Sequence, residues 1–108
     1  MHNKPKILVI CSRNKKRSAT AESIYRGSRT VEVRSAGTSQ KANHVVSHKD
    51  AAWADIILCM EEKHSDKMSQ LFPDAQLPKI IVLDIPDEYE FMDPELVDML
   101  RSEIESHL

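Results

Sequence analysis

The stretch ILVICSRNKKRSATAE, residues 7–22, carries the strongest structural signal in this sequence. It opens with a continuous apolar run rich in β-branched residues, which is typical of a strand buried on both faces. The run ends at Cys11, a basic polar loop follows, and a helix-forming segment begins at Ser18. A lone cysteine at the end of a buried strand is usually a small core residue. Here, however, a basic loop and a helix follow the cysteine directly, and this combination calls for a chemical explanation.

The rest of the chain continues this alternation of strand and helix. Apolar and alternating runs predict strands at residues 6–11, 30–37, 54–60 and 79–85, the second as an edge strand and the others as buried strands. Helical spacing and stop signals predict helices at residues 18–26, 47–53 and 64–72 and from residue 94 onward. This order predicts the α/β class: a single-domain, doubly wound, four-stranded parallel sheet with helices on both faces.

Three helix boundaries have recognisable chemistry. Gly27 stands where a capping glycine would end a helix. Ser47, with Asp50 three residues later, resembles a capping box. Asp93 and Pro94 are the residue types that begin a helix as N-cap and first residue.

The composition bounds the class of protein. The chain has 108 residues, 41% of them hydrophobic and 30% charged, which fits one soluble domain over residues 1–108. The formal net charge is -2, so no global field favours nucleic acid or a membrane as partner. The apolar runs are too short for a membrane span or an export signal, which predicts a cytoplasmic protein.

Cysteine and histidine usage predicts no metal and no cofactor. The two cysteines, Cys11 and Cys59, form no CxxC pair, and the five histidines show no ligand spacing. Both cysteines should be thiols in a reducing compartment. Cys59 ends a strand with no basic loop after it, so we interpret it as core packing, and we interpret His64, on an apolar helix face, in the same way.

The loop after the first strand has the residue types of a phosphate cradle. In an open parallel sheet, ligands bind at the carboxyl ends of the strands, where Cys11 lies. A strand-to-helix loop points backbone N–H groups at one centre, and the helix dipole adds positive potential that also stabilises a thiolate. Arg17 can bind two phosphoryl oxygens, Asn14 tolerates a left-handed backbone, and Ser18 can bond the sulfur or cap the helix. The candidate phosphate-binding residues are therefore Cys11, Ser12, Arg13, Asn14, Lys15, Lys16, Arg17 and Ser18.

These residues resemble the phosphate loop of the low-molecular-weight protein tyrosine phosphatases, with its Cys-x5-Arg-Ser pattern, mid-loop Asn and following Ala-Glu. The resemblance continues in VRSAGTS, ADIILCMEEKH and DIPDEY, and it is strongest with a short bacterial branch of predicted phosphatases. It implies a phosphocysteine intermediate and no metal, with Cys11 as nucleophile, Arg17 as phosphate clamp, and Asn14, Ser18 and Ser35 as supports of the loop. The family often has Gly where this chain has Arg13, so Arg13 would be strained if that position needs a positive φ.

Three aspartates compete for the role of general acid. Asp93 precedes Pro94 and is expected to be occupied as a helix N-cap. Asp84 lies at the end of the last strand, where it can organise the loop. Asp87 lies just beyond and matches the acid position of the family, so we expect Asp87 to be the acid.

The expected function is hydrolysis of a phosphomonoester by a cysteine nucleophile. The substrate is either a phosphotyrosine protein, as the resemblance implies, or a small phosphomonoester. Three alternatives use the same loop: an arsenate reductase, which needs resolving thiols; a phosphocysteine carrier, which retains the phosphoryl group; and a phosphoanion-binding module without turnover. Tyr89 and Phe91, beside the acid loop, either wall an aromatic substrate or pin the loop. The pattern defines no oligomeric state.

Overall fold

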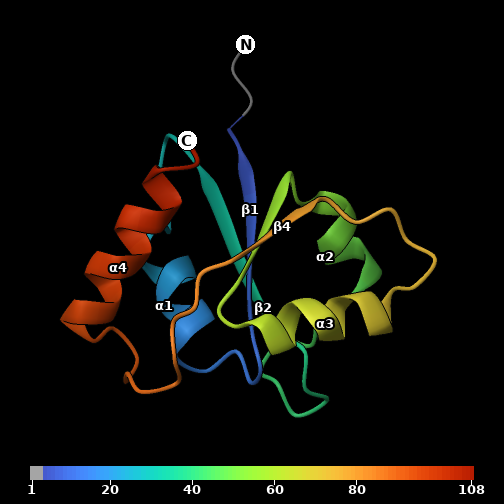
Figure 1. The fold of residues 1–108 in the computed structure, drawn as a ribbon. Coiled ribbons are helices and arrows are strands. Elements are labelled where there is room, and N and C mark those ends of the chain that lie inside the picture. The colour runs from blue at the N-terminus through green and yellow to red at the C-terminus, as the bar shows by residue number, and fades with distance from the viewer. Residues whose placement is uncertain (1–3) are drawn as a thin grey trace.

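Four parallel strands form a single sheet in the computed structural model, which describes residues 4–108. The strands are β1 (Lys6–Cys11), β2 (Glu32–Gly37), β3 (Ile56–Cys59) and β4 (Lys79–Val82), in the order β2-β1-β3-β4. They alternate along the chain with the helices α1 (Arg17–Ile24), α2 (His48–Trp53), α3 (Glu62–Leu71) and α4 (Pro94–Glu105) (Figure 1). The predicted fold class is confirmed.

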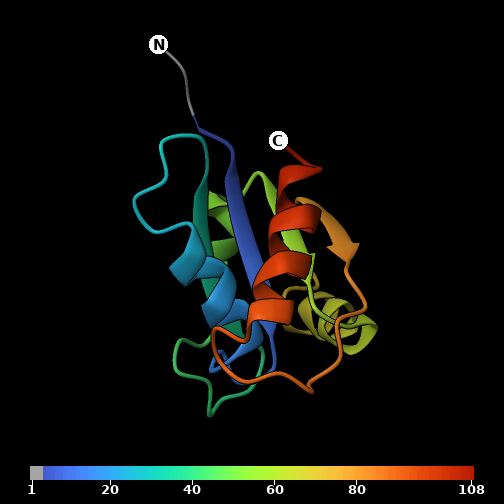
Figure 2. The same cartoon turned by 90° about the vertical axis from the view of Figure 1, so that its left-hand side faces the viewer.

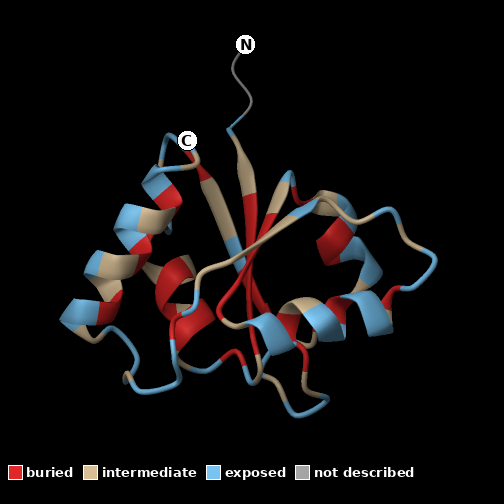
Figure 3. Ribbon diagram, viewed as in Figure 1, coloured by how far each residue is buried: buried red, intermediate tan, exposed pale blue. Residues whose placement is uncertain are grey.

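Helices cover both faces of the sheet. Helices α1 and α4 pack on one face and α2 and α3 on the other, as the two views in Figures 1 and 2 show. Strand β1 supplies both cores, because successive side chains of a strand point to opposite faces. Ile7, Val9 and Cys11 lie in the core under α1 and α4, and Leu8 and Ile10 lie in the other. Figure 3 shows that buried residues concentrate along the central strands.

The two outer strands differ from the two central ones in burial. Strand β2 is an edge strand, as its alternating pattern predicts. The prediction that residues 79–85 form a buried strand is wrong: Lys79 is exposed and the rest of β4 is only half-buried. The physical reason is the strand order, since β4 pairs only with β3 within residues 4–108.

The predicted helix starts are confirmed by hydrogen bonds. The Ser47 N–H donates to the Asp50 carboxylate at 2.9 Å, and the Asp50 N–H donates back to Ser47 Oγ at 3.3 Å. The Glu95 N–H donates to Asp93 Oδ1 at 2.9 Å, and Pro94 is the first residue of α4. Gly27 has φ +76°, but α1 ends at Ile24 with Tyr25 as its C-cap, so the predicted end of this helix at residue 26 is wrong by two residues. Every helix in the described range is too short or too polar to span a bilayer.

The strand order also locates the functional edge. The chain crosses from β1 to β2 on one side and later adds β3 on the other side of β1. The carboxyl end of β1 is therefore a topological switch point, where open α/β sheets bind ligands. Cys11 is the last residue of β1.

Candidate active site

Cys11 lies beneath the loop that joins β1 to α1, and its sulfur has two polar neighbours. The side chain is 3% exposed. The Asn14 N–H donates to Cys11 Sγ at 3.2 Å, and Ser18 Oγ lies 2.9 Å from the same sulfur. The Asn14 N–H and the Ser18 hydroxyl are therefore both within hydrogen-bonding distance of the sulfur.

The first four carbonyl oxygens of this loop, from Cys11 to Asn14, point toward the segment that follows β2. The N–H groups of Thr38, Ser39 and Asn43 donate to the carbonyls of Cys11, Ser12 and Arg13 at 3.0, 2.9 and 3.0 Å, and Asn43 Nδ2 donates to the Asn14 carbonyl at 3.1 Å. In a planar trans peptide the N–H points opposite to the C=O. The loop N–H groups therefore face the other side, toward the Cys11 sulfur, which is the arrangement of an anion-binding nest.

Two backbone positions allow this close approach. A Cβ on Gly37 would lie 2.5 Å from the Ser12 carbonyl oxygen and 2.6 Å from the Ala42 Cβ, so only glycine fits between the two segments. Asn14 takes the left-handed backbone with φ 56°, as its residue type predicts. Arg13 is not among the residues with positive φ in the described range, so the strain considered at that position is absent.

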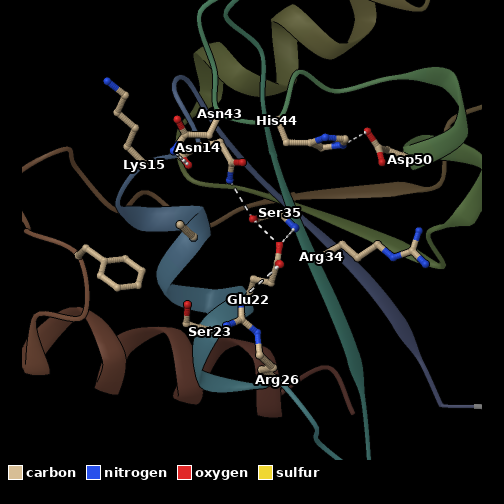
Figure 4. Close-up of a pocket in the computed structure, with 12 residues that line it drawn as sticks. Asn14, Lys15, Glu22, Ser23, Arg26, Arg34, Ser35, Asn43, His44 and Asp50 are labelled. Atoms are coloured by element: carbon tan, nitrogen blue, oxygen red, sulfur yellow. Dashed lines mark hydrogen bonds and ion pairs between the residues drawn. The ribbon is translucent and has the colours of Figure 1, made fainter.

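A buried hydrogen-bond network supports the sulfur from behind. Asn14 Nδ2 donates to Ser18 Oγ at 2.9 Å and to Ser35 Oγ at 2.8 Å. Ser35 in turn donates its N–H and its hydroxyl to Glu22 Oε1, at 2.8 and 2.6 Å (Figure 4). Because Ser18 Oγ accepts from Asn14, its own proton is left for the Cys11 sulfur. Asn14, Ser18 and Ser35 thus lie together as expected.

Arg17 is fixed at one corner of its guanidinium group. The side chain is 3% exposed, and its Nη1 donates to the Glu61 carboxylate and, at 2.8 Å, to the Ile85 carbonyl. Nε lies 3.8 Å from Asp87 Oδ1. Within residues 4–108 the edge formed by Nε and Nη2 has only this long contact with Asp87, so it is the part open to a ligand, and it has the fork geometry that two phosphoryl oxygens need.

A cavity of about 310 Å³ brings most of the predicted residues together. Its lining consists of Cys11, Ser12, Arg13, Lys15, Lys16, Arg17 and Asp87. Asp87 is 67% exposed and reaches this cavity from the segment after β4. Neither of the other two aspartates lines it: Asp93 caps α4, and Asp84, with φ 57°, lines a separate hollow with Glu61 and Pro86. The arrangement places a thiol, a guanidinium fork and a carboxyl group around one space.

Several solved structures with the same architecture are phosphatases. SP-PTP, a low molecular weight protein tyrosine phosphatase from Streptococcus pyogenes, has a TM-score of 0.77 at 16% identity, over 96% of this chain and 93% of that chain. The tyrosine phosphatase Wzb from Escherichia coli K30 has 0.73 at 22%, over 96% of each. The YwlE arginine phosphatase from Geobacillus stearothermophilus has 0.67 at 24%, over 94% and 86%.

The chain has the low-molecular-weight protein tyrosine phosphatase fold. The resemblance seen in the sequence is thereby confirmed at the level of the fold, which is what identities of this size show. No protein-family model matches the sequence, and no curated protein is significantly similar to it.

In this phosphatase fold, the start of α3 contacts both ends of the phosphate loop. Glu61 holds Arg17, and this hydrogen bond keeps the pKa of the Glu61 carboxyl below its usual range. His64, 1% exposed, accepts the Glu61 N–H at Nδ1 (3.0 Å) and places Nε2 2.9 Å from Ser12 Oγ. The neutral ring therefore carries its proton on Nε2 and donates it to Ser12. His64 is packed in the core, as predicted, yet it also positions the loop.

Burial lowers the pKa of His64 to about 4, and the neighbouring Arg17 adds to this effect. The imidazole is thus neutral at ordinary pH, which its hydrogen bonds require.

Sequence patterns did not assign roles to Glu22, Glu61 and Asn43, which brace the site from three different segments. A carboxylate on a helix or a loop amide is usually solvated surface, so residue type alone carries no signal here. Glu22 does belong to the Ala-Glu pair that follows the phosphate loop in the resembling family.

The second cysteine of this phosphatase fold lies on the other face of the sheet. Cys59 is fully buried on the face covered by α2 and α3, whereas Cys11 faces α1 and α4. Burial raises the pKa of the Cys59 thiol to about 12. Cys59 is core packing, as predicted. Within residues 4–108, no group of three or more His, Cys, Asp or Glu is arranged to hold a metal ion.

The two aromatic residues beside Asp87 have different surroundings. Tyr89 is partly buried against the core under α1 and α4, where it pins the segment after β4. Phe91 is 50% exposed and lines a larger cavity on the far side of the phosphate loop. That cavity, of about 810 Å³, does not reach the Cys11 thiol, so the smaller one is the candidate catalytic site.

Proposed function

We propose that this protein is a cysteine-dependent phosphomonoester hydrolase with Cys11 as nucleophile. The observation that carries the proposal is the shared cavity: the Cys11 sulfur, the Arg17 fork and the Asp87 carboxyl group surround one space beneath inward-facing loop N–H groups. A phosphoryl group in this space would meet donors on its equatorial oxygens and a thiolate on its axis.

The proposed reaction has two steps. In the first, the thiolate attacks phosphorus, an S–P bond forms, and the ester P–O bond breaks while Asp87 gives its proton to the leaving oxygen. In the second, the Asp87 carboxylate takes a proton from water, whose oxygen bonds to phosphorus as the S–P bond breaks. Inorganic phosphate and the Cys11 thiolate are the products, and neither step uses a metal or a cofactor.

Proteins of the same fold support a covalent intermediate. In one solved relative, a cysteine-to-serine mutant of the YwlE arginine phosphatase, the active site serine is phosphorylated. Solved structures with the same fold include Wzb in complex with phosphate and Wzb in complex with benzylphosphonate. A phosphocysteine at Cys11 is the corresponding proposal for this chain.

The alternatives fit the geometry less well. An arsenate reductase needs a second thiol that reaches the nucleophile, and Cys59 lies on the opposite face of the sheet. A phosphocysteine carrier gains nothing from a carboxyl group beside the Arg17 fork, since a carrier must not hydrolyse its phosphoryl group. A pure binding module does not need a buried thiol at the floor of the cavity.

A panel of phosphomonoesters tests the proposal. Phosphotyrosine, phosphoserine and nucleotides, together with phosphoarginine because of the YwlE similarity, should be assayed with the natural protein and with Cys11→Ser. We expect turnover of at least one aryl ester, with phosphotyrosine protein as the proposed substrate class, and complete loss in Cys11→Ser. Equal phosphate release by the two proteins would refute the proposal. We propose a cytoplasmic location and no nucleic acid or membrane partner; gel filtration would establish the oligomeric state.

A further inference from the structure

The segment that carries Asp87 has no helix or strand of its own. We call residues 83–93 the acid segment, and Figures 1 and 2 show it, in orange, running from the end of β4 past α1 to the start of α4. Asp87 is 67% exposed, and within residues 4–108 its only cationic neighbour within 4.0 Å is Arg17. The place of its carboxyl group beside the catalytic cavity therefore depends on what holds the two ends of the segment.

The first end of the acid segment is held by β3 and by Arg17. The Ile85 N–H donates to the Met60 carbonyl at 2.9 Å, so the chain continues along β3 beyond the end of β4. The Ile85 carbonyl accepts from Arg17 Nη1 at 2.8 Å, and the Ile85 side chain is buried. Asp87 follows this fixed point by two residues.

The second end of the acid segment is a tight turn that α1 holds in place. The Asp93 N–H donates to the Glu90 carbonyl at 3.1 Å, and Met92, within the turn, has φ 65°. The Met92 N–H donates to Thr20 Oγ1 at 2.9 Å. Thr20 lies in α1, three residues after Arg17, and is fully buried. The helix that begins with the phosphate clamp thus also supplies the anchor of the turn.

A further contact between the same two parts of the chain is weaker. Lys16 Nζ lies 3.1 Å from Glu90 Oε2, but these side chains are 44% and 81% exposed. Solvent and salt screen an exposed ion pair, and such pairs contribute little to stability. The Thr20 hydroxyl is buried and is not screened in this way, so it is the contact on which the position of the turn depends.

We propose that Thr20 is a positioning residue: through the turn that contains Met92, it holds Asp87 beside the catalytic cavity. This inference rests on the proposed phosphatase function, with Asp87 as its acid. A general acid must lie within hydrogen-bonding distance of the leaving oxygen, and a displacement of about 1 Å can lower the rate about 100-fold. Because Arg17 and Thr20 belong to one helix, the phosphoryl clamp and the anchor of the acid keep a fixed distance from each other.

Thr20→Val tests the anchor, since it replaces the hydroxyl group with a methyl group and keeps the branched shape. We expect kcat for phenyl phosphate to fall about tenfold and kcat for p-nitrophenyl phosphate to fall less than about twofold, because a poor leaving group depends more on the acid. Competitive inhibition by inorganic phosphate should be unchanged. Thr20→Ser retains the acceptor oxygen and should behave like the natural protein. Thr30→Val, the same exchange at an exposed position, is the matched control.

A double-mutant cycle with Asp87→Asn separates positioning from a general structural effect. If Thr20 acts through Asp87, Thr20→Val should cause no further loss with phenyl phosphate once residue 87 is asparagine. An equal loss on both backgrounds, or an equal loss with both esters, would overturn the inference.

If the natural protein hydrolyses neither ester, or if Asp87→Asn has no leaving-group effect, the proposed function or its acid fails, and NMR tests the anchor independently. Thr20→Val should speed amide hydrogen exchange at Met92 and lower the order parameter of the Asp87 N–H, whereas Thr30→Val should change neither. An unchanged order parameter at Asp87 in Thr20→Val would overturn the inference, whatever the activity.

Discussion

At the scale of single residues, Cys11 depends on neighbours that each have one defined task. Ser18 and the Asn14 N–H contact the sulfur, Arg17 offers a fork, and Asp87 stands on the open side of the cavity. These neighbours distinguish Cys11 from Cys59, which is an ordinary buried cysteine.

The Arg17 fork gives the first prediction. Arg17→Lys should lower kcat by about two or more orders of magnitude, because an ammonium group cannot hold Glu61 and the Ile85 carbonyl while it also binds two phosphoryl oxygens. Steady-state kinetics with p-nitrophenyl phosphate measure the loss. Arg29→Lys, the same exchange at an exposed position, is the control. Near-normal turnover in folded Arg17→Lys would contradict the clamp.

The choice between Asp87 and Asp93 gives the second prediction. A poor leaving group needs protonation more than p-nitrophenolate does. Asp87→Asn should therefore slow phenyl phosphate more than p-nitrophenyl phosphate and remove the basic limb of the pH profile. Asp93→Asn should cost little, since asparagine also caps a helix well. If Asp93→Asn rather than Asp87→Asn shows the leaving-group effect, the assignment is wrong.

At the scale of elements, two segments hold the phosphate loop from opposite sides. The segment after β2 donates hydrogen bonds to its carbonyl groups. At the start of α3, His64 bonds to Ser12 and Glu61 accepts a hydrogen bond from Arg17. A loop held only by its own strand and helix would be free to turn its N–H groups away from the cavity. The geometry of the loop thus depends on four parts of the chain: β1, α1, the segment after β2 and the start of α3.

The buried His64 gives the third prediction, on stability and pH. Its pKa is about 4 in the folded protein and about 6.5 in an unfolded chain, so the unfolded state binds more protons between these values. The free energy of unfolding should fall as the pH is lowered from about 7 to about 4, by up to about 3 kcal/mol. Glu61, whose carboxyl pKa is also lowered, adds a loss of the same sign below its unfolded value.

Urea unfolding at a series of pH values measures this dependence. His64→Gln should flatten it between about pH 7 and 5, above the range in which the Glu61 carboxyl contributes. His48→Gln alters an exposed histidine and should preserve the natural slope. A natural protein whose stability is constant over that interval would contradict the neutral, buried His64.

At the scale of the whole molecule, the strand order decides which residues meet. Placing β1 between β2 and β3 brings the segment after β2 and the start of α3 to the same edge as Cys11. The register between β1 and β3 pairs Ile10 with Cys59, and this offset of one residue puts Cys11 and Cys59 on opposite faces of the sheet, although they end neighbouring strands.

Gly37 gives the fourth prediction, because it lies where two distant segments touch. Gly37→Ala should lower both kcat/KM and stability, the latter by about 1–3 kcal/mol, since its Cβ would meet the Ser12 carbonyl at 2.5 Å. Gly27→Ala is the control: its φ is +76° but nothing lies within 4 Å, so only stability should fall, by about 1 kcal/mol. Activity lost equally in both variants would show that close packing at Gly37 is not the cause.

The sequence by itself determined the local structure and the chemistry of the loop. Hydrophobic period, capping residues and the glycine after α1 depend on neighbours a few positions away, so they predicted the elements and their order. The pattern of Cys11, Asn14, Arg17 and Ser18 predicted a phosphate cradle for the same reason: all four lie on one short loop.

Only the tertiary structure decided which distant residues complete the site. Glu22, Asn43, Glu61 and His64 contact the loop or its supports across 13 to 52 positions of sequence, a separation over which no periodic pattern extends. The half-exposed state of β4 has the same origin, because its apolar composition is that of a central strand and only the strand order leaves it at the edge. Side-chain type records what a residue can do, whereas strand order and packing determine which residues lie within hydrogen-bonding distance.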